Sequence, residues 1–348
     1  MGLDKMAKTI FRGSALYHEK VRNYRFGEKE LEFLSLNMPP ECNYNCVGCF
    51  SRIKRLNTRS SLNLEEIYNL LDQAKELGIV GLEISGEGEP LMHEERLLNT
   101  INYANSLGII TTLFTNGSLL TEKNIEFLAE NNVSLALSLD YLDKEKYEKN
   151  VCRKNTFDSL MKNMELARDI YASLIEIEEG YRVMRFAIHS IADSTSIHEI
   201  PKIKEFCRDD IYYSIAPIAN VGSAEKRPEL NIDTDDVSKI IRQYSEESII
   251  VSNSTINERG FSICGTFYYG LGISHEGEVL FDAHAFDTRR LIGNVRDFPL
   301  TELITKQRRL RNRFYEKGSR NFCPLRDPNY HEFIQNLKEE KNAGISIS

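Results

Sequence analysis

Short apolar stretches alternate with amphipathic helical stretches through most of this chain, and that alternation limits the folds open to it. The expected strands are residues 31–38, 79–84, 109–114, 133–139, 181–188 and 211–218. The expected helices between them are residues 63–77, 94–106, 122–130, 157–172 and 196–207. Strands separated by helices of roughly 10 to 15 residues pair in parallel, and right-handed crossovers cover both faces of their sheet. The pattern predicts an α/β fold in which six βα units form a partial barrel, with functional residues at the carboxyl ends of the strands.

The rhythm changes after residue 217 of the 348. A polar loop at 221–231 precedes an expected helix at 234–245 and an expected β-hairpin at 265–284 that turns at 275–277. We therefore expect four parts, which are listed in chain order: an N-terminal segment (1–30), the partial barrel (31–222), a small α+β extension (223–330) and a polar tail (331–348).

Acidic residues outnumber basic residues by 52 to 44, which gives a net charge of -8. A protein that binds the nucleic-acid backbone needs a cationic face, so this balance argues against such a partner. No apolar run approaches the roughly 18 residues of a spanning helix, and the start of the chain lacks the apolar segment of a secretory signal. We therefore expect a cytoplasmic protein without a membrane or nucleic-acid partner.

Three of the seven cysteines lie close together in the loop after the first expected strand. Cys42, Cys46 and Cys49 form a CxxxCxxC pattern, and a loop this short can turn all three thiols toward one centre. Thiolates so placed suit an iron–sulfur cluster or zinc. A closed zinc site needs a fourth ligand nearby, yet no Cys or His lies between Cys49 and His93. Three ligands to a four-iron cluster leave one iron open to chelate a cofactor.

Two further motifs follow the next two expected strands. Residues 85–90 read SGEGEP, and residues 115–118 read TNGS. Asn116 and Ser138 can each hydrogen-bond a ligand from the end of a strand. Alternatively, the Asn-Gly pair forms a simple turn, and Ser118 or Thr121 caps the following helix.

These motifs resemble those of the radical S-adenosylmethionine (SAM) superfamily, and the resemblance covers roughly residues 30–220. It implies a 4Fe-4S cluster held by Cys42, Cys46 and Cys49, with SAM chelated at the open iron. It also implies a set of SAM-binding residues: Gly86, Gly88, Glu89, Asn116, Ser138 and Arg185. In this interpretation the glycines let backbone carbonyls approach the ligand, and Glu89 accepts hydrogen bonds from the methionyl ammonium group. Many members carry an aromatic residue just before the third cysteine, where this chain has Gly48.

The C-terminal part resembles the twitch or SPASM-type extension of radical SAM enzymes, in which cysteines around a hairpin hold an auxiliary cluster. Cys264 precedes the expected hairpin, Asp282 stands at its end, and Cys323 follows a basic helix at 306–313. Two of the usual thiolates are missing, so the resemblance implies either an unusual cluster with Cys264, Asp282 and Cys323 as ligands or a domain without metal. Cys264 or Cys323 is alternatively a thiol that donates a hydrogen atom to a substrate radical. The cations at 306–313 are expected to form a solvated helix face, with an anionic substrate as the alternative.

The resemblance implies an enzyme that reductively cleaves SAM to a 5′-deoxyadenosyl radical, which then removes a hydrogen atom from a substrate. The first 30 residues are too few for a leader-peptide domain, so we expect a small molecule, such as a sugar or aminocyclitol, to be oxidised or epimerised. Modification of a ribosomal peptide and a non-catalytic iron–sulfur or zinc protein are the alternatives. A flavodoxin or ferredoxin is the expected electron donor.

Overall fold

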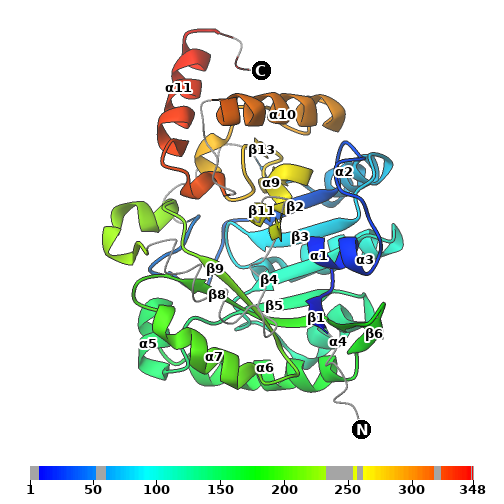
Figure 1. Ribbon diagram of the computed structural model, residues 1–348, viewed down its shortest axis with the longest axis vertical. Helices are drawn as coiled ribbons and strands as arrows, with labels where there is room; N and C mark the ends of the chain where they lie inside the picture. Colours follow the sequence, from blue (N-terminus) through cyan, green and yellow to red (C-terminus); the bar gives the residue numbers. More distant parts are fainter. Residues whose placement is uncertain are drawn as a thin grey trace.

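The computed structural model describes residues 8–51, 60–232, 254–256, 262–316, 323–345 and 347. Figure 1 shows a curved central sheet, with α5, α6 and α7 at the bottom of the view and α10 and α11 at the top. No helix in these ranges is both long and apolar enough to cross a bilayer.

An eight-stranded sheet forms the centre of the fold, with the strand order β13-β12-β2-β3-β4-β5-β8-β9. Six of these strands correspond to the expected ones: β2 (Phe33–Met38), β3 (Gly81–Gly86), β4 (Ile110–Thr115), β5 (Ser134–Ser138), β8 (Phe186–Ala192) and β9 (Tyr212–Pro217). They are all parallel to their neighbours, which confirms the α/β fold with a parallel sheet. The carboxyl ends of these strands therefore lie at the same end of the barrel, and the loops that follow the strands meet there.

Helices connect these strands: α2 (Leu64–Glu76), α3 (Glu94–Ser106), α4 (Glu122–Glu130), α5 (Lys144–Asn150), α6 (Phe157–Ala172) and α7 (Ile200–Cys207). The sequence determines where α2 begins, because the Asn63 and Glu66 side chains each accept a hydrogen bond from the other residue's backbone N–H. The apolar faces of the helices join strand residues such as Leu34 and Leu113 in one continuous core. Burial of this core on the outer face of the sheet holds the strand ends in place.

The prediction of a single strand at 181–188 is wrong, because this stretch is divided between two sheets. Strand β7 (Tyr181–Met184) pairs with β1 (Lys8–Phe11) and β6 (Glu176–Glu178) in a separate three-stranded sheet, and β8 starts after Arg185. Two side chains of β1 pack inside the barrel. Ile10 clusters with Ile110, and the Phe11 ring stacks on Tyr212 at 5.3 Å between ring centroids. The segment from β1 to α1 (Ala15–Lys20) thus covers the amino ends of the parallel strands.

The expected C-terminal hairpin is present but shorter than predicted. Residues 265–269 form a short helix, α9 (Gly265–Tyr269), and only β12 (Gly270–Ile273) and β13 (Val279–Leu280) pair as a hairpin. Its turn is closed by a hydrogen bond from Gly277 N–H to the Ser274 carbonyl, 2.9 Å. Strand β12 also pairs in parallel with β2, so the hairpin extends the barrel sheet.

Two helices pack over this hairpin. The rings of Phe281, Phe314 and Phe333 join α10 (Leu300–Glu316) and α11 (Tyr330–Asn342) to the sheet, with neighbouring centroids 5.0 to 5.6 Å apart. Residues 331–342 are therefore helical with a buried apolar face, which corrects the expectation of a polar tail over this range. The helix expected at 234–245 lies outside the described residues. The remaining strands, β10 (Ser254–Ile256) and β11 (Ser262–Cys264), pair only with each other.

Candidate functional site

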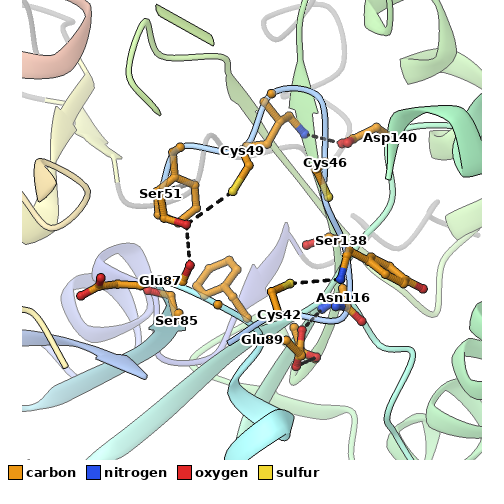
Figure 2. Close-up of a pocket in the computed structure, with 18 of the residues that line it drawn as sticks. Cys42, Cys46, Cys49, Ser51, Ser85, Glu87, Glu89, Asn116, Ser138 and Asp140 are labelled. Atoms are coloured by element: carbon orange, nitrogen blue, oxygen red, sulfur yellow. Dashed lines mark hydrogen bonds between the residues drawn. The ribbon is translucent and has the colours of Figure 1, made fainter. Parts of the chain in front are cut away.

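A cavity of about 210 Å³ lies where the cysteine loop meets the carboxyl ends of the barrel strands (Figure 2). Parallel α/β sheets bind their ligands at this end, where the carboxyl ends of the strands lie. With one exception, the side chains predicted from the barrel motifs line this cavity: Cys42, Cys46, Cys49, Gly86, Gly88, Glu89, Asn116 and Ser138. The exception is Arg185. Phe50, Phe114, Ile191 and Ile218 add apolar walls.

All three cysteines of the loop have free thiols. The Cys42 sulfur accepts a hydrogen bond from the Tyr44 N–H at 3.4 Å, and the Cys49 sulfur lies 3.4 Å from the Ser51 hydroxyl. Burial raises the pKa of the Cys46 thiol, and the nearby Cys49 thiol raises it further. Three thiolates so close together repel one another unless bound cations offset their charge. Iron supplies that charge, so the donor set fits an iron–sulfur cluster.

The two glycines of the GEGEP turn are required because the turn packs directly against the cysteine loop. A Cβ on Gly88 would lie 1.9 Å from the Glu41 carbonyl oxygen, and one on Gly86 would lie 2.0 Å from the Gly88 carbonyl oxygen. The Glu89 N–H donates to the Glu41 carbonyl at 2.8 Å. The expected reason for these glycines was close approach of a ligand. The structure adds a contact between two loops, which places the turn next to Cys42.

Glu89 is buried between the GEGEP turn and the TNG turn. Its carboxylate accepts hydrogen bonds from the Thr115 hydroxyl at 2.5 Å, from the Asn116 N–H at 2.8 Å and from the Leu91 N–H at 3.1 Å. Burial raises the pKa of Glu89, whereas these three donors lower it. A carboxylate offers about four acceptor positions, so one remains for a ligand in the cavity.

Asn43 is a site residue that the sequence analysis missed. Its side-chain oxygen accepts a hydrogen bond from the Asn116 amide at 2.9 Å, and its own amide donates to the Ser118 hydroxyl at 2.7 Å. The Ser118 N–H in turn donates to the Asn116 side-chain oxygen at 2.9 Å. The TNG turn therefore lines the cavity and also holds the cysteine loop. The signal in the sequence was an Asn placed directly after the first cysteine.

The Thr121 side chain caps helix α4, which was the alternative interpretation of the segment that follows the Asn-Gly pair.

Two polar residues lie at the end of β5. Ser138 lines the cavity, and Asp140 lies two residues further along the chain on the same face. The Asp140 carboxylate accepts hydrogen bonds from the Ile191 N–H at 2.8 Å and from the Asn150 amide at 3.0 Å. Burial raises the pKa of Asp140 to about 7, despite these two donors. In the sequence, Asp140 directly follows the fourth expected strand, 133–139.

The interpretation of Arg185 as a SAM-binding residue needs correction. Arg185 precedes β8 and therefore lies at the amino end of the barrel, whereas the cavity lies at the carboxyl end. Its guanidinium group donates to the Asn132 side chain at 3.0 Å and lies 5.9 Å from the centre of the Tyr171 ring. The error came from treating 181–188 as one strand, which placed Arg185 within it rather than before β8.

Of the three expected auxiliary ligands, Asp282 and Cys323 are buried. Burial raises the pKa of the Cys323 thiol, whereas the charge of Arg326 lowers it and that of Asp282 raises it. Cys264 ends β11, where it pairs with Ser254, and its side chain is outside the described part of the structure. Among the described residues, no three His, Cys, Asp or Glu side chains are placed to hold a single metal ion.

A polar cluster lies between the two edge strands of the sheet, β13 and β9. It consists of His189, Asp282, His284 and Arg326. Asp282 and His284 follow the edge strand β13, and the His284 ring nitrogen is 3.8 Å from the Asp282 carboxylate. Arg326 donates to the Pro217 and Ile218 carbonyls at the end of the other edge strand, β9. Burial, together with the charges of His284 and Arg326, lowers the pKa of His189 to about 4.

This polar cluster adjoins the cavity through two phenylalanines. Phe50 and Phe114 line the cavity. The Phe50 ring lies edge-on to His284 at 4.9 Å, and the Phe114 ring lies edge-on to His189 at 5.2 Å between centroids. A molecule that reaches past these two rings therefore meets polar side chains.

The basic stretch of α10 is largely bound to the protein itself. Arg313 pairs with Glu340 at 2.8 Å, and Lys306 pairs with Glu302 at 2.7 Å. Arg308 and Arg311 donate to backbone carbonyls, those of residues 30 and 268 among them. The Lys306 pair lies within α10, whereas the three arginines attach the helix to neighbouring segments. Neither a solvated face nor a site for an anionic substrate describes this role.

The comparisons with known proteins agree with this site. Residues 36–177 match the family model described as the radical SAM superfamily. An uncharacterised protein of Methanocaldococcus jannaschii is 29% identical over 180 residues, which are 49% of this chain and 58% of that protein. The Fe-coproporphyrin III synthase of Methanosarcina barkeri is 24% identical over 241 residues, which are 68% of this chain and 55% of that enzyme. The chain thus spans little more than half the length of these relatives.

A solved structure has the same fold. The histidine-tagged form of anSMEcpe with bound AdoMet superposes with a TM-score of 0.60 over 90% of this chain and 98% of that one, at 16% identity. The matched residues 36–177 contain the cysteine loop, the GEGEP turn and the TNG turn, which line one cavity. Residues 36–177 thus form a radical SAM domain, and members of that superfamily use a 4Fe-4S cluster and S-adenosylmethionine.

Proposed function

We propose that this chain is a radical SAM enzyme that removes a hydrogen atom from a small polar molecule, such as a sugar or aminocyclitol, which is then oxidised or epimerised. The observation that carries the proposal is the convergence of three free thiols and two ligand-binding turns on one cavity. The electron donor is proposed to be a flavodoxin or a ferredoxin.

Cys42, Cys46 and Cys49 are proposed to hold the 4Fe-4S cluster. Gly86, Gly88, Glu89, Asn116 and Ser138 are proposed to bind SAM, since they line the same cavity. When bound together, the cluster and SAM supply a 5′-deoxyadenosyl radical, which is the chemistry that the protein itself lacks. Glu89 has one free acceptor position for the ammonium group of SAM.

The remaining task of the chain is to orient the substrate and to exclude water. Phe50, Phe114, Ile191 and Ile218 form apolar walls around the cavity. Beyond Phe50 and Phe114, the polar cluster offers a carboxylate, two imidazoles and a guanidinium group. Such a mixture of donors and acceptors beside aromatic rings suits a molecule with several hydroxyl groups.

Transfer of one further electron from the substrate radical to an oxidised cluster, with loss of a proton to solvent, gives oxidation. Return of a hydrogen atom to the opposite face of the radical gives epimerisation. Cys323 and Cys264 are proposed as the hydrogen donor or, with Asp282, as ligands of an auxiliary cluster. Burial keeps the Cys323 thiol protonated, as hydrogen donation requires. A thiyl radical left on the cysteine is then reduced by the electron donor and protonated from solvent.

Anaerobic reconstitution with iron and sulfide tests the proposal. We expect cluster absorbance and 5′-deoxyadenosine that forms only with dithionite. The triple variant C42A/C46A/C49A should lose both, and persistence of SAM cleavage in this variant would overturn the assignment. About four irons retained by the triple variant would indicate an auxiliary cluster. One equivalent of zinc without SAM binding would favour the non-catalytic alternative.

The substrate class is tested separately, with sugars and aminocyclitols in D₂O. Deuterium in the recovered product indicates epimerisation, because a thiol exchanges its hydrogen with solvent. A product lacking two hydrogens indicates oxidation. Turnover of a ribosomal peptide but of no small molecule would replace this substrate class by the peptide alternative.

A further inference from the structure

Glu87, the central residue of the GEGEP turn, forms an ion pair with Arg289 of the C-terminal region. Both side chains are buried, with exposed fractions of 1% and 7%. The second Glu87 oxygen accepts a hydrogen bond from the His275 N–H at 3.3 Å. Burial lowers the pKa of Arg289 to about 10, so the guanidinium group remains charged at neutral pH. A buried pair of charges contributes little net stability, so its position in this turn calls for another explanation.

The same Glu87 contacts the cysteine loop through its backbone. Its carbonyl accepts a hydrogen bond from the Ser51 hydroxyl at 2.5 Å, and that hydroxyl lies 3.4 Å from the Cys49 sulfur (Figure 2). The path from the C-terminal region to the third cysteine thus has only two intervening residues, Glu87 and Ser51. Displacement of Glu87 would move the Ser51 hydroxyl relative to the Cys49 sulfur.

A second path runs through aromatic rings to the same place. The Arg289 guanidinium group lies 5.4 Å from the centre of the Phe286 ring. Phe286 stacks on Phe50 at 5.7 Å, with 19° between the ring planes. Phe50 directly follows Cys49. Arg289 is therefore linked to this cysteine by two routes, one through Glu87 and Ser51 and the other through Phe286 and Phe50.

We infer that Arg289 is a positioning residue for Cys49 and that, through Glu87 and Ser51, it sets the reduction potential of the cluster. The inference rests on the proposed function, because it requires a cluster on Cys49. Positive charge near a cluster favours its reduced state. Loss of Arg289 removes a buried positive charge beside the Glu87 carboxylate, so the cluster becomes harder to reduce. The Ser51 hydroxyl donates its single proton to the Glu87 carbonyl, so its part is to position Cys49 and not to donate a hydrogen bond to the sulfur.

A matched control exists on the same side of the molecule. Arg296 also joins the C-terminal region to the barrel, by pairing with Glu66 at 2.5 Å. It further donates to the Ser60 carbonyl at 3.0 Å. Its other contacts lie near the start of α2 and at the Glu276 carbonyl of the hairpin turn, and not at the GEGEP turn. R296M therefore breaks an ion pair between the same two regions without removing a contact of Glu87.

The experiment is a redox titration of the reconstituted protein, followed by electron paramagnetic resonance. We expect R289M to lower the ratio of reduced to oxidised cluster about tenfold at a fixed potential, which corresponds to about 59 mV for a one-electron couple. S51A keeps the charge of Arg289, so it should change the ratio less than R289M does. R289K should restore most of the wild-type ratio, and R296M should leave it unchanged.

A second readout needs no cluster. In metal-free protein, we expect iodoacetamide to alkylate Cys49 several-fold faster in R289M than in wild type, with the rate at Cys42 unchanged. An unchanged potential and alkylation rate in R289M, or an equal shift in R296M, would overturn the inference. If R289M does not fold, the alkylation of Cys49 in metal-free S51A decides, and a wild-type rate in that variant would also overturn the inference. If the wild type itself binds no cluster, the proposed function fails instead.

Discussion

The Asn116 side-chain amide donates a hydrogen bond to the Asn43 side-chain oxygen at 2.9 Å, which joins the end of β4 to the cysteine loop. The two residues lie 73 positions apart in the chain. The loop that carries the thiols is therefore held by the strand end that lines the ligand cavity. Cysteine position and ligand binding are thus coupled through one pair of amides.

This pair predicts the effect of N43A, since Asn43 is not among the residues that line the cavity. Loss of its two side-chain hydrogen bonds should destabilise the protein by about 1 to 2 kcal/mol. The iron content after reconstitution and the affinity for SAM should both fall several-fold. Isothermal titration calorimetry and iron analysis measure these effects. N99A, which removes an amide hydrogen bond on the surface of α3, serves as control and should leave both unchanged.

The contact between Gly88 and the Glu41 carbonyl predicts the effect of G88A. The added methyl group must displace backbone, because it would lie 1.9 Å from a carbonyl oxygen. We expect a loss of about 3 kcal/mol in the free energy of unfolding, together with poor cluster incorporation. G180A is a useful comparison. Its Cβ meets nothing within 4 Å, and only its φ of +77° opposes the substitution, at a cost of about 1 kcal/mol. Equal losses in the two variants would contradict the close approach of the loops.

His18 predicts a pH dependence of stability. Its ring is fully buried, and no described residue hydrogen-bonds either ring nitrogen. Burial lowers the pKa of His18 from 6.5 to about 3. The unfolded chain therefore binds this proton first, and stability present above pH 6.5 is lost as the pH falls toward 3. At pH 5 the loss amounts to about 2 kcal/mol.

H18F should remove this component, because Phe fits the ring cluster around Phe33 without a titrating nitrogen. Urea unfolding at pH 7.5 and pH 5 measures it: the decrease in unfolding free energy between these pH values should be about 2 kcal/mol smaller in H18F. H331F changes an exposed ring on α11 and should behave as wild type. An unchanged pH dependence in H18F would show that His18 is protonated within the folded protein.

The position of Arg185 predicts that R185M leaves the chemistry intact. The affinity for SAM and the rate of 5′-deoxyadenosine formation should stay within twofold of wild type. The melting temperature should fall by a few degrees, because the hydrogen bond to Asn132 is lost. A large loss of SAM affinity without a stability change would restore Arg185 as a binding residue.

Features encoded by local sequence were predictable. Helix α3 has the predicted bounds, because its apolar residues recur at helical spacing between clear breaks. The cysteine loop and the two turns line one cavity, because parallel strands bring their carboxyl ends together. These are consequences of periodicity and of sheet geometry, neither of which needs knowledge of distant contacts.

Features that depend on distant pairing were not predictable. Strand β12 pairs with β2 across more than 200 residues of chain, and nothing within 270–273 indicates which strand it joins. The break at Arg185 separates two strands because β7 has β1 as a partner, which a single apolar run does not reveal. The roles of Asn43 and of Glu87 depend equally on partners far along the chain.

The pairing of β12 with β2 bears on how the chain can be divided. The cysteine loop follows β2, and β2 is an interior strand only because the hairpin occupies its outer side. A fragment that stops before the hairpin would leave the amide and carbonyl groups on that side of β2 exposed to solvent. Such open edges recruit strands from other molecules, so the shortened protein should aggregate through the strand that precedes its cysteine loop.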